Sequence, residues 1–228
     1  MTKHIILIGG SYGIGRSLAA ELVGEGNQVT VISRTAGDLK DVSYITHDAS
    51  SSEPFPAIDG PIDGLAYLPG TINLKPFHRL TNEDFVTDLR VNVLGGVSAI
   101  QAFLPNLKES MSASIVLFST VAVQTGMTFH SSVAVSKGAV EGLTRALAAE
   151  FSPKIRVNCI APSLTETPLA EKLLNTPQKQ ESAAERHPLK RFGRPGDIAS
   201  AAAFLLTGNS GFITGAIIPV DGGLGSIR

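Results

Sequence analysis

The chain has 228 residues, of which 43% are hydrophobic and 17% charged, and its net charge is -1 at pH 7. These values are typical of a globular protein with a large core, and the near-neutral charge argues against a nucleic-acid partner. The apolar runs are shorter than the roughly 20 residues of a bilayer span, and the first residues lack a signal-peptide cleavage site. We therefore expect a cytoplasmic protein that binds neither nucleic acid nor membrane.

Apolar runs of strand length alternate along the chain with segments of helical periodicity. The runs are Ile5–Ile8, Val29–Ser33, Leu65–Leu68, Ile115–Ser119, Arg156–Ile160 and Ala216–Val220. The helical segments are Gly15–Gly24, Asn82–Leu104, Ser132–Phe151, Thr167–Leu174 and Asp197–Leu206. Nearly continuous apolar strands are typical of a parallel sheet covered on both faces, and the alternation indicates βαβ units. The sequence predicts one α/β domain over residues 1–228, a Rossmann-type, doubly wound parallel sheet with helices on both faces.

The first predicted strand runs into a glycine-rich turn and then into a helix. Glycine allows a tight turn and a close approach of the backbone to a pyrophosphate, and the helix N-terminus presents free N–H groups. Such a turn alone is a weak signal, but its place between the first strand and the first helix strengthens it. We expect a dinucleotide's phosphates to be bound by Gly9, Ser11, Tyr12, Gly13, Ile14 and Gly15.

The second predicted strand ends at Ser33 and Arg34. An acidic side chain near this point would bind the ribose 2′-hydroxyl of NAD, whereas arginine suits the 2′-phosphate of NADP. A guanidinium donates parallel hydrogen bonds to phosphate oxygens. Asp38 follows in a predicted loop. The pattern favours NADP(H), and the alternative is a solvated arginine without a ligand.

The predicted helix Ser132–Phe151 carries two apolar stripes. One has small side chains, at Val135, Ala139, Gly142, Ala146 and Ala149. The other is bulkier, at Val140, Leu143, Leu147 and Phe151. Together they cover more of the helix than packing on one sheet face requires. We expect one stripe to face the sheet and the other to face a neighbouring helix or, preferably, a second subunit.

Several segments together resemble the short-chain dehydrogenase/reductase family, from about Lys3 to Gly223. The segments are Gly9–Gly15, Val91–Gly95, Arg156–Pro162, Pro188–Pro195, Phe212–Gly215 and Val220–Gly223. The resemblance implies about seven parallel strands and a homodimer or homotetramer. It further implies that the cofactor is contacted by Asp48, Ala49, Gly70, Lys137, Pro162 and Thr167. Ser163 stands where the family usually has glycine.

The family's catalytic residues are a tyrosine, a lysine four positions later, a serine and an asparagine. The matching positions here are Asn92, Thr120, Val133 and Lys137. The spacing from Gly126 to Lys137 is intact, so valine replaces the tyrosine, and valine has no proton to donate. Loss of a positioned acid typically lowers a rate by about 10²–10⁴-fold. His130 is a candidate replacement because histidine exchanges protons near neutrality, and a loop histidine without a catalytic role is the alternative.

These features predict an atypical NADP(H)-dependent oxidoreductase that acts on a small carbonyl or alcohol substrate. The alternative is a catalytically silent NADP(H)-binding protein that acts as a sensor or supports a partner. A purely structural Rossmann domain is disfavoured because the phosphate turn and Arg34 are intact. The histidines and the single cysteine are too scattered to suggest a metal site. The polar segment Leu169–His187, which caps the substrate in the family, is expected to be mobile.

Overall fold

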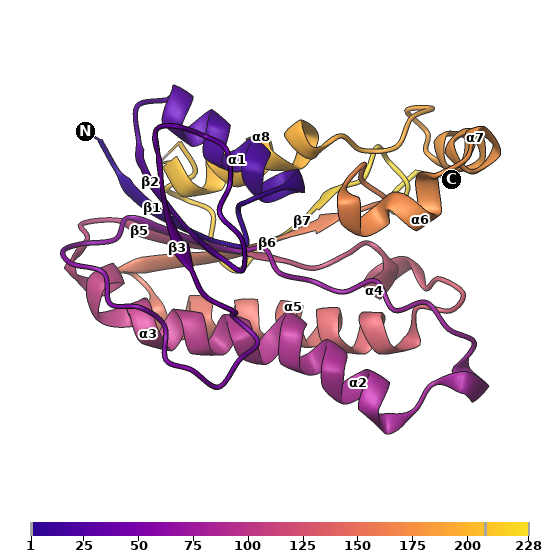
Figure 1. The fold of residues 1–228 in the computed structure, drawn as a ribbon, viewed down its shortest axis with the longest axis horizontal. Helices are drawn as coiled ribbons and strands as arrows, with labels where there is room; N and C mark the ends of the chain where they lie inside the picture. Colours follow the sequence, from indigo (N-terminus) through magenta and orange to yellow (C-terminus); the bar gives the residue numbers. More distant parts are fainter. Residues whose placement is uncertain (1, 208, 228) are drawn as a thin grey trace.

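The computed structural model describes residues 2–207 and 209–227, and it has the predicted α/β architecture (Figure 1). Seven parallel strands form one sheet in the order β3-β2-β1-β4-β5-β6-β7. They are β1 (His4–Ile8), β2 (Gln28–Ser33), β3 (Val42–Thr46), β4 (Gly64–Tyr67), β5 (Ala113–Phe118), β6 (Ile155–Pro162) and β7 (Ile217–Val220). Strand β3 has no counterpart among the apolar runs, because it lies at the edge of the sheet and several of its side chains are partly exposed.

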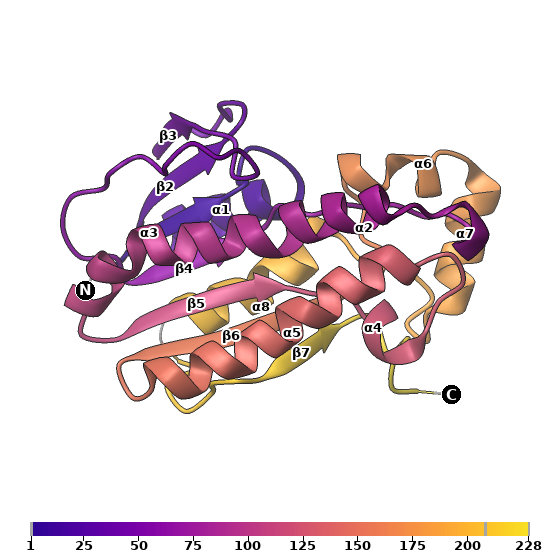
Figure 2. The ribbon, with the colours of Figure 1, turned by 90° about the horizontal axis from the view of Figure 1, so that it is seen from below.

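Helices cover both faces of the sheet. On one face, α1 (Gly13–Gly24) packs against α8 (Pro195–Thr207). On the other lie α2 (Asn82–Leu89), α3 (Gly95–Glu109) and α5 (Ser131–Phe151), and Figure 2 shows α5 running beside the α2–α3 pair. No helix in the described residues is both long and apolar enough to cross a membrane.

The apolar core forms two clusters, one on each face of the sheet. In β1, Ile5 and Leu7 belong to the cluster under α1 and α8, whereas Ile6 and Ile8 belong to the cluster under α3 and α5. Successive side chains of a strand point to opposite faces. A strand buried on both faces therefore appears in the sequence as a continuous apolar run.

The two stripes of α5 have different surroundings. Val140 is buried, and Leu143, Leu147 and Phe151 pack against the same core cluster. The small-residue stripe, from Val135 to Ala149, is exposed along its whole length. The bulkier stripe is therefore the one that faces the interior of this chain.

Several helices differ from the prediction. The segment expected as one helix over Asn82–Leu104 consists of α2, a π-helical turn η2 (Arg90–Leu94) and α3. The segment Thr167–Leu174 forms a 3₁₀ turn, η3 (Pro168–Ala170), followed by α6 (Glu171–Leu174). The short elements η1 (Phe77–Arg79) and α4 (Ala122–Thr125) were not expected.

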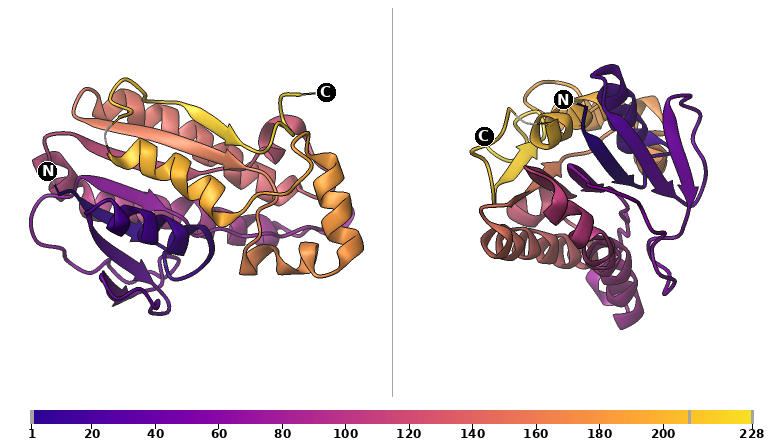
Figure 3. Two further views of the ribbon diagram at one scale, coloured as in Figure 1. Left: turned by 90° about the horizontal axis from the view of Figure 1, so that it is seen from above. Right: turned by 90° about the vertical axis from the view of Figure 1, so that its left-hand side faces the viewer.

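The polar cap segment also contains a helix that the sequence did not predict, α7 (Pro177–Arg186). Thr176 caps its N-terminus by accepting a hydrogen bond from the N–H of Lys179, and Pro177 stands at the first helical position. Ala183 is its buried residue, so the apolar periodicity that normally reveals a helix is almost absent. Figures 1 and 3 show α6 and α7 beyond the carboxyl end of the sheet.

The connections define where a ligand can bind. Strands β1 and β4 are neighbours, but α1 after β1 and the α2–α3 pair after β4 lie on opposite faces. Ligands of doubly wound sheets bind at such a switch point, outside the carboxyl ends of the strands.

Candidate active site

A cleft of about 1440 Å³ lies at this edge of the sheet. It extends from the ends of β2 and β3, past the glycine turn, to the ends of β5 and β6 and the cap helices. Every residue expected to contact the cofactor lines it, namely Gly9, Ser11, Tyr12, Gly13, Ile14, Gly15, Ser33, Arg34, Asp48, Ala49, Gly70, Lys137, Pro162 and Thr167. Of the expected catalytic residues, Thr120, His130 and Lys137 line the cleft, whereas Asn92 is buried outside its lining.

The glycine turn is held tightly against the first strands. The N–H of Gly9 donates to the carbonyl oxygen of Ile32 at 2.8 Å, and Gly9 and Gly13 have φ angles of 83° and 57°. A Cβ atom on Gly15 would lie 2.4 Å from the carbonyl oxygen of Gly9. Glycine is therefore required at these positions for close packing and for left-handed backbone conformations.

The N-terminus of α1 is open to a ligand. Tyr12 is its extended N-cap residue, and no side chain caps the first turn, which also contains no acidic residue. The first N–H groups of a helix have no partner within the helix, and they carry the positive end of its dipole. With the glycines beside them, they form a cradle that suits a pyrophosphate.

The far end of the cleft carries an exposed arginine. Arg34 lines the cleft and, within residues 2–207 and 209–227, makes no hydrogen bond or ion pair. The nearby carboxylate of Asp38 is occupied by Arg16, whose Nε and Nη2 atoms donate to it at 2.7 and 2.8 Å. This pairing lowers the pKa of Asp38. Arg34 is thus a cation without a hydrogen-bonded partner among the described residues, and its charge helps to lower the pKa of the neighbouring Asp48.

Hydroxyl groups connect the glycine turn to the end of β2. The Ser33 hydroxyl donates to the carbonyl oxygen of Thr35 at 2.7 Å, and the hydroxyls of Thr35 and Ser11 lie 3.1 Å apart. Thr35 also lines the cleft and was not anticipated from the sequence. Its position directly after Arg34 was the available signal.

Asp48 and His47 form the neighbouring wall. Asp48 accepts hydrogen bonds from the N–H and hydroxyl of Ser50, at 2.9 and 2.7 Å, which lower its pKa. The ring of His47 packs on Phe55 with centroids 4.5 Å apart. The Nε2 atom of His47 is buried and, among the described residues, has no hydrogen-bond partner.

Lys137 lies at the centre of the cleft. Its Nζ atom donates to the carbonyl oxygen of Phe118 at 2.8 Å, and a Cβ atom on Gly70 would lie 3.4 Å from that Nζ. Burial lowers the pKa of Lys137 to about 8. The ammonium keeps donor capacity for a ligand, because it has three hydrogens.

Val133 occupies the tyrosine position of the family pattern. Its side chain is 5% exposed and lines the cleft, one helical turn before Lys137. The Thr120 hydroxyl accepts a hydrogen bond from the N–H of Ala122 at 3.3 Å. His130 is the N-cap residue of α5 but does not cap it with its side chain, because its Nδ1 atom lies 2.8 Å from the carbonyl oxygen of Thr128. These three positions supply one hydroxyl and one imidazole but no phenol.

Asn92 lies in the π-helical turn η2, behind the cleft. Its Nδ2 atom donates to the hydroxyls of Ser136 at 2.8 Å and Thr71 at 3.0 Å, and its Oδ1 atom accepts from the N–H of Thr71 at 3.0 Å. The side chain therefore joins α5 to the segment after β4. Its contacts with protein groups explain why it does not reach the cleft.

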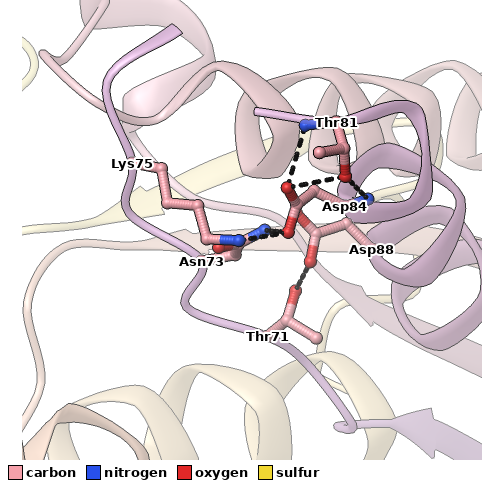
Figure 4. A network of polar contacts seen from close by, with 6 residues as sticks. All are labelled: Thr71, Asn73, Lys75, Thr81, Asp84 and Asp88. Atoms are coloured by element: carbon pink, nitrogen blue, oxygen red, sulfur yellow. Dashed lines mark hydrogen bonds and ion pairs between the residues drawn. The ribbon is translucent and has the colours of Figure 1, made fainter. Parts of the chain in front are cut away.

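The segment after β4 is fastened to α2 by the network in Figure 4. The Thr71 hydroxyl donates to Asp88 at 2.6 Å, while Asn73 and Lys75 donate to Asp84 at 3.2 and 2.5 Å. Asp84 also closes a capping box with Thr81. The hydrogen bond from Lys75, ahead of those from Thr81 and Asn73, lowers the pKa of Asp84. These bonds fix one wall of the cleft.

Tyr67 ends β4, close to the cleft but not in its lining. Its hydroxyl donates to the carbonyl oxygen of Val91 at 2.6 Å, and burial raises its pKa. A phenol that is buried and bonded in this way is a structural group rather than a proton donor.

A second pair of polar side chains in the cleft was not anticipated from the sequence. The Nε2 atom of His187 lies 2.8 Å from the hydroxyl of Ser163, and its Nδ1 atom lies 2.6 Å from the carbonyl oxygen of Ala183. Both residues line the cleft. The replacement of the usual glycine by Ser163 was the signal that could have revealed the pair.

The mouth of the cleft is mixed in character. Its apolar lining is Ile72, Leu74, Phe129, Leu169 and Leu173, and α7 adds Gln178, Lys179, Ser182 and Arg186. Phe129 is 51% exposed and has a φ angle of 68°. Such a left-handed conformation is unfavourable for a bulky residue, and here it places an aromatic ring at the entrance.

The cradle, the guanidinium of Arg34 and the buried lysine fit an extended anionic ligand at a topological switch point. Together with the fold, they define a dinucleotide-binding α/β protein of the oxidoreductase type. When bound, a nicotinamide dinucleotide supplies or accepts a hydride.

Comparisons with known proteins agree with this class. The family model described as Enoyl-(Acyl carrier protein) reductase matches residues 9–225. L-xylulose reductase of Bos taurus is 32% identical, over 97% of this chain and 96% of its own length. A tropinone reductase homolog of Arabidopsis thaliana is 34% identical, over 97% and 91%. Ligand-free aldohexose dehydrogenase of Thermoplasma acidophilum has a TM-score of 0.90 at 29% identity, covering 100% of this chain and 95% of that chain.

The chain therefore belongs to the short-chain dehydrogenase/reductase family, whose members use nicotinamide cofactors. The family assignment and the seven-stranded parallel sheet expected from the resemblance are both confirmed.

Proposed function

We propose that this protein is an NADP(H)-dependent oxidoreductase that transfers a hydride between the nicotinamide and a small carbonyl or alcohol substrate. The observation that carries the proposal is the guanidinium of Arg34, which lines the cleft without a hydrogen-bonded partner in the described residues, while Asp38, the carboxylate nearest to it in the sequence, is paired with Arg16. A 2′-phosphate would meet a cation there, whereas the 2′-hydroxyl of NAD would meet no free carboxylate from Asp38.

Other residues of the cleft support cofactor binding and substrate positioning. The open N-terminus of α1 would bind the pyrophosphate, and Lys137 would bind the nicotinamide ribose through its remaining hydrogens. The Thr120 hydroxyl can donate a hydrogen bond that orients a substrate carbonyl, since it serves only as the acceptor in its bond with Ala122. Relatives named as reductases, of L-xylulose and of 3-oxoacyl-[acyl-carrier-protein], are consistent with carbonyl substrates.

Cofactor choice can be tested by fluorescence titration, which is clean because the chain contains no tryptophan. We expect the wild type to bind NADPH at least tenfold more tightly than NADH, and Arg34→Ala to abolish that difference. Lys40→Ala is the matched control, because Lys40 is an exposed cation near Arg34 that does not line the cleft. Tighter binding of NADH by the wild type would refute the proposal.

One observation favours a second candidate, a catalytically silent NADP(H)-binding sensor or structural partner. Val133 lines the cleft where the family places its proton donor. The test is a carbonyl panel with NADPH, run on the wild type and on Val133→Tyr. Turnover only in the tyrosine variant would support the silent binder, whereas turnover by the wild type supports the oxidoreductase.

We further propose that the exposed small-residue stripe of α5 forms the contact of a homodimer or homotetramer. Small side chains allow two helices to approach closely, and a Cβ atom added to Gly142 would meet no neighbouring side chain of the described residues within 4 Å. Light scattering of the wild type and of Gly142→Glu tests this surface. A stable wild-type monomer at micromolar concentration would contradict it.

A further inference from the structure

The pair formed by Ser163 and His187 has a defined hydrogen-bond direction. A backbone carbonyl only accepts hydrogen bonds, so the Nδ1 atom of His187, 2.6 Å from the oxygen of Ala183, must carry a hydrogen. In neutral imidazole the Nε2 atom is then an acceptor, and the Ser163 hydroxyl donates to it across 2.8 Å. When His187 is protonated, Nε2 donates instead, and the serine hydrogen is released for another acceptor.

The two side chains differ in their access to solvent. His187 is 2% exposed, with its ring packed against Gly222, whereas Ser163 is partly exposed in the cleft wall. The serine is therefore the more accessible member of the pair for a substrate in the cleft. This is the order required of a proton relay.

Ser163 and Thr120 follow two strands that are neighbours in the sheet. In the register of β5 and β6, Phe118 pairs with Ile160, and the N–H of Val121 donates to the carbonyl oxygen of Pro162 at 3.1 Å. Thr120 and Ser163 therefore follow neighbouring strand ends and line the same cleft.

We propose that Ser163 is the proton donor that replaces the missing tyrosine, with His187 as the positioning residue that supplies its proton. The inference rests on the proposed oxidoreductase function. As the hydride reaches the carbonyl carbon, the carbonyl oxygen takes the Ser163 hydrogen and Ser163 takes the Nε2 hydrogen of His187. The imidazolium becomes neutral and keeps its Nδ1 hydrogen. The reverse sequence removes the proton of an alcohol.

Charged residues stand on the segments next to His187. On its own segment these are Glu185, Arg186 and Lys190, and the Nζ atom of Lys190 donates to the carbonyl oxygen of Glu185. From the turn before Gly222, Asp221 uses its two carboxylate oxygens to accept the N–H groups of Gly223 and Gly225. Lys137 lines the same cleft from α5. The variants at Ser163 and His187 leave Lys137 and Asp221 unchanged.

The kinetic test uses NADPH with L-xylulose, diacetyl and cyclohexanone as carbonyl probes. Ser163→Ala and Ser163→Gly should lower kcat by about 10²–10⁴-fold, with the Kd of NADPH changed less than about threefold. Ser163→Thr, which restores a hydroxyl, should recover most of the rate. His187→Gln, which removes the imidazole, should lower kcat as well, again with the Kd of NADPH changed less than about threefold. If His187→Gln does not fold, the kcat values of Ser163→Ala, Ser163→Gly and Ser163→Thr alone decide whether Ser163 donates the proton.

A second readout does not depend on turnover. In ¹⁵N-histidine NMR spectra without cofactor, the neutral His187 ring should be the Nδ1–H tautomer, and its Nε2 resonance should move in Ser163→Ala. An Nε2–H tautomer, or an unchanged resonance, would overturn the relay.

The outcomes separate the two proposals. A wild type that binds NADPH but turns over no probe contradicts the oxidoreductase proposal and the relay with it. If the wild type is active and Ser163→Ala has the same kcat, the relay alone is overturned. If turnover is lost in His130→Ala but not in Ser163→Ala, the relay is also overturned and His130 is the proton donor.

Discussion

The ammonium nitrogen of Lys137 lies 2.8 Å from the carbonyl oxygen of Phe118, so the buried lysine of α5 is bound to the last residue of β5. A carbonyl dipole compensates only part of the lost hydration of an ammonium group. The pKa of Lys137 is therefore lowered to about 8.

This shift gives the stability of the protein a pH dependence. Lysine titrates near 10.5 when unfolded, so between pH 8 and 10.5 the unfolded state binds more protons and the free energy of unfolding should rise with pH. Below pH 8 both states are protonated and the burial penalty is constant. The rise should total about 3 kcal/mol at most, and Lys137→Met should lack it. Urea unfolding at pH 7.5 and 10 measures the rise, with exposed Lys108→Met as the control. If the free energy of unfolding changed equally with pH in Lys137→Met and Lys108→Met, this account would be contradicted.

Two glycines of α1 should respond oppositely to alanine. In Gly15→Ala the new Cβ would lie 2.4 Å from the Gly9 oxygen, so the turn must open, and we expect NADPH binding to weaken at least 100-fold. In Gly24→Ala the Cβ meets no atom within 4 Å, and the higher helix propensity of alanine should stabilise the fold by up to about 1 kcal/mol. Cofactor titration and thermal unfolding of the two variants test the prediction. Wild-type cofactor affinity in Gly15→Ala would show that the turn does not bind phosphate.

The Thr71 hydroxyl donates to buried Asp88 and accepts from Asn92. Thr71→Val would leave both groups short of a partner, at a cost of about 2 kcal/mol in the free energy of unfolding. Thr71→Ser keeps the hydroxyl and should recover most of that loss. Denaturant titrations that show equal stability for the valine and serine variants would mean that the network contributes nothing.

Arg156 is buried in the first half of β6. Its Nη atoms donate to the carbonyl oxygens of Leu205 and Ser210, at 3.0 and 3.1 Å, near the C-terminus of α8. Arg156→Met would remove these bonds and should destabilise the protein by about 2–3 kcal/mol. Exposed Lys154→Met should change stability by less than about 0.5 kcal/mol. Similar unfolding midpoints for Arg156→Met and Lys154→Met would show that the hydrogen bonds of Arg156 do not stabilise the C-terminus of α8.

The sequence predicted the parts of the fold that depend on local patterns. The buried strands could be identified because they are largely apolar on both faces, and the glycine turn because its backbone needs glycine at Gly9, Gly13 and Gly15. Strand β3 did not stand out as an apolar run because the edge strand is half exposed, and helix α7 was not predicted because it buries little beyond Ala183.

The candidate site was predictable where residues follow strands, and not where they meet across the chain. Arg34 was predicted from its position at the end of the second strand and Lys137 from the family resemblance, and both line the cleft. The pairing of Ser163 with His187 joins positions 24 residues apart through the course of α7, which no periodicity encodes. The partner of Asp38 was similarly invisible, because Arg16 lies on another element.

The π-helical turn η2 determines which face of the following helix, α3, points toward the core. Tyr67 holds the Val91 carbonyl from one side, and Asn92 holds Thr71 and Ser136 from the other. Deleting one residue between Arg90 and Leu94 would rotate α3 by roughly 100° relative to α2. Phe103 and Leu107 would then leave the core, while the position of α2 would not change. Insertions and deletions should therefore be tolerated in the surface loops but not within these five positions.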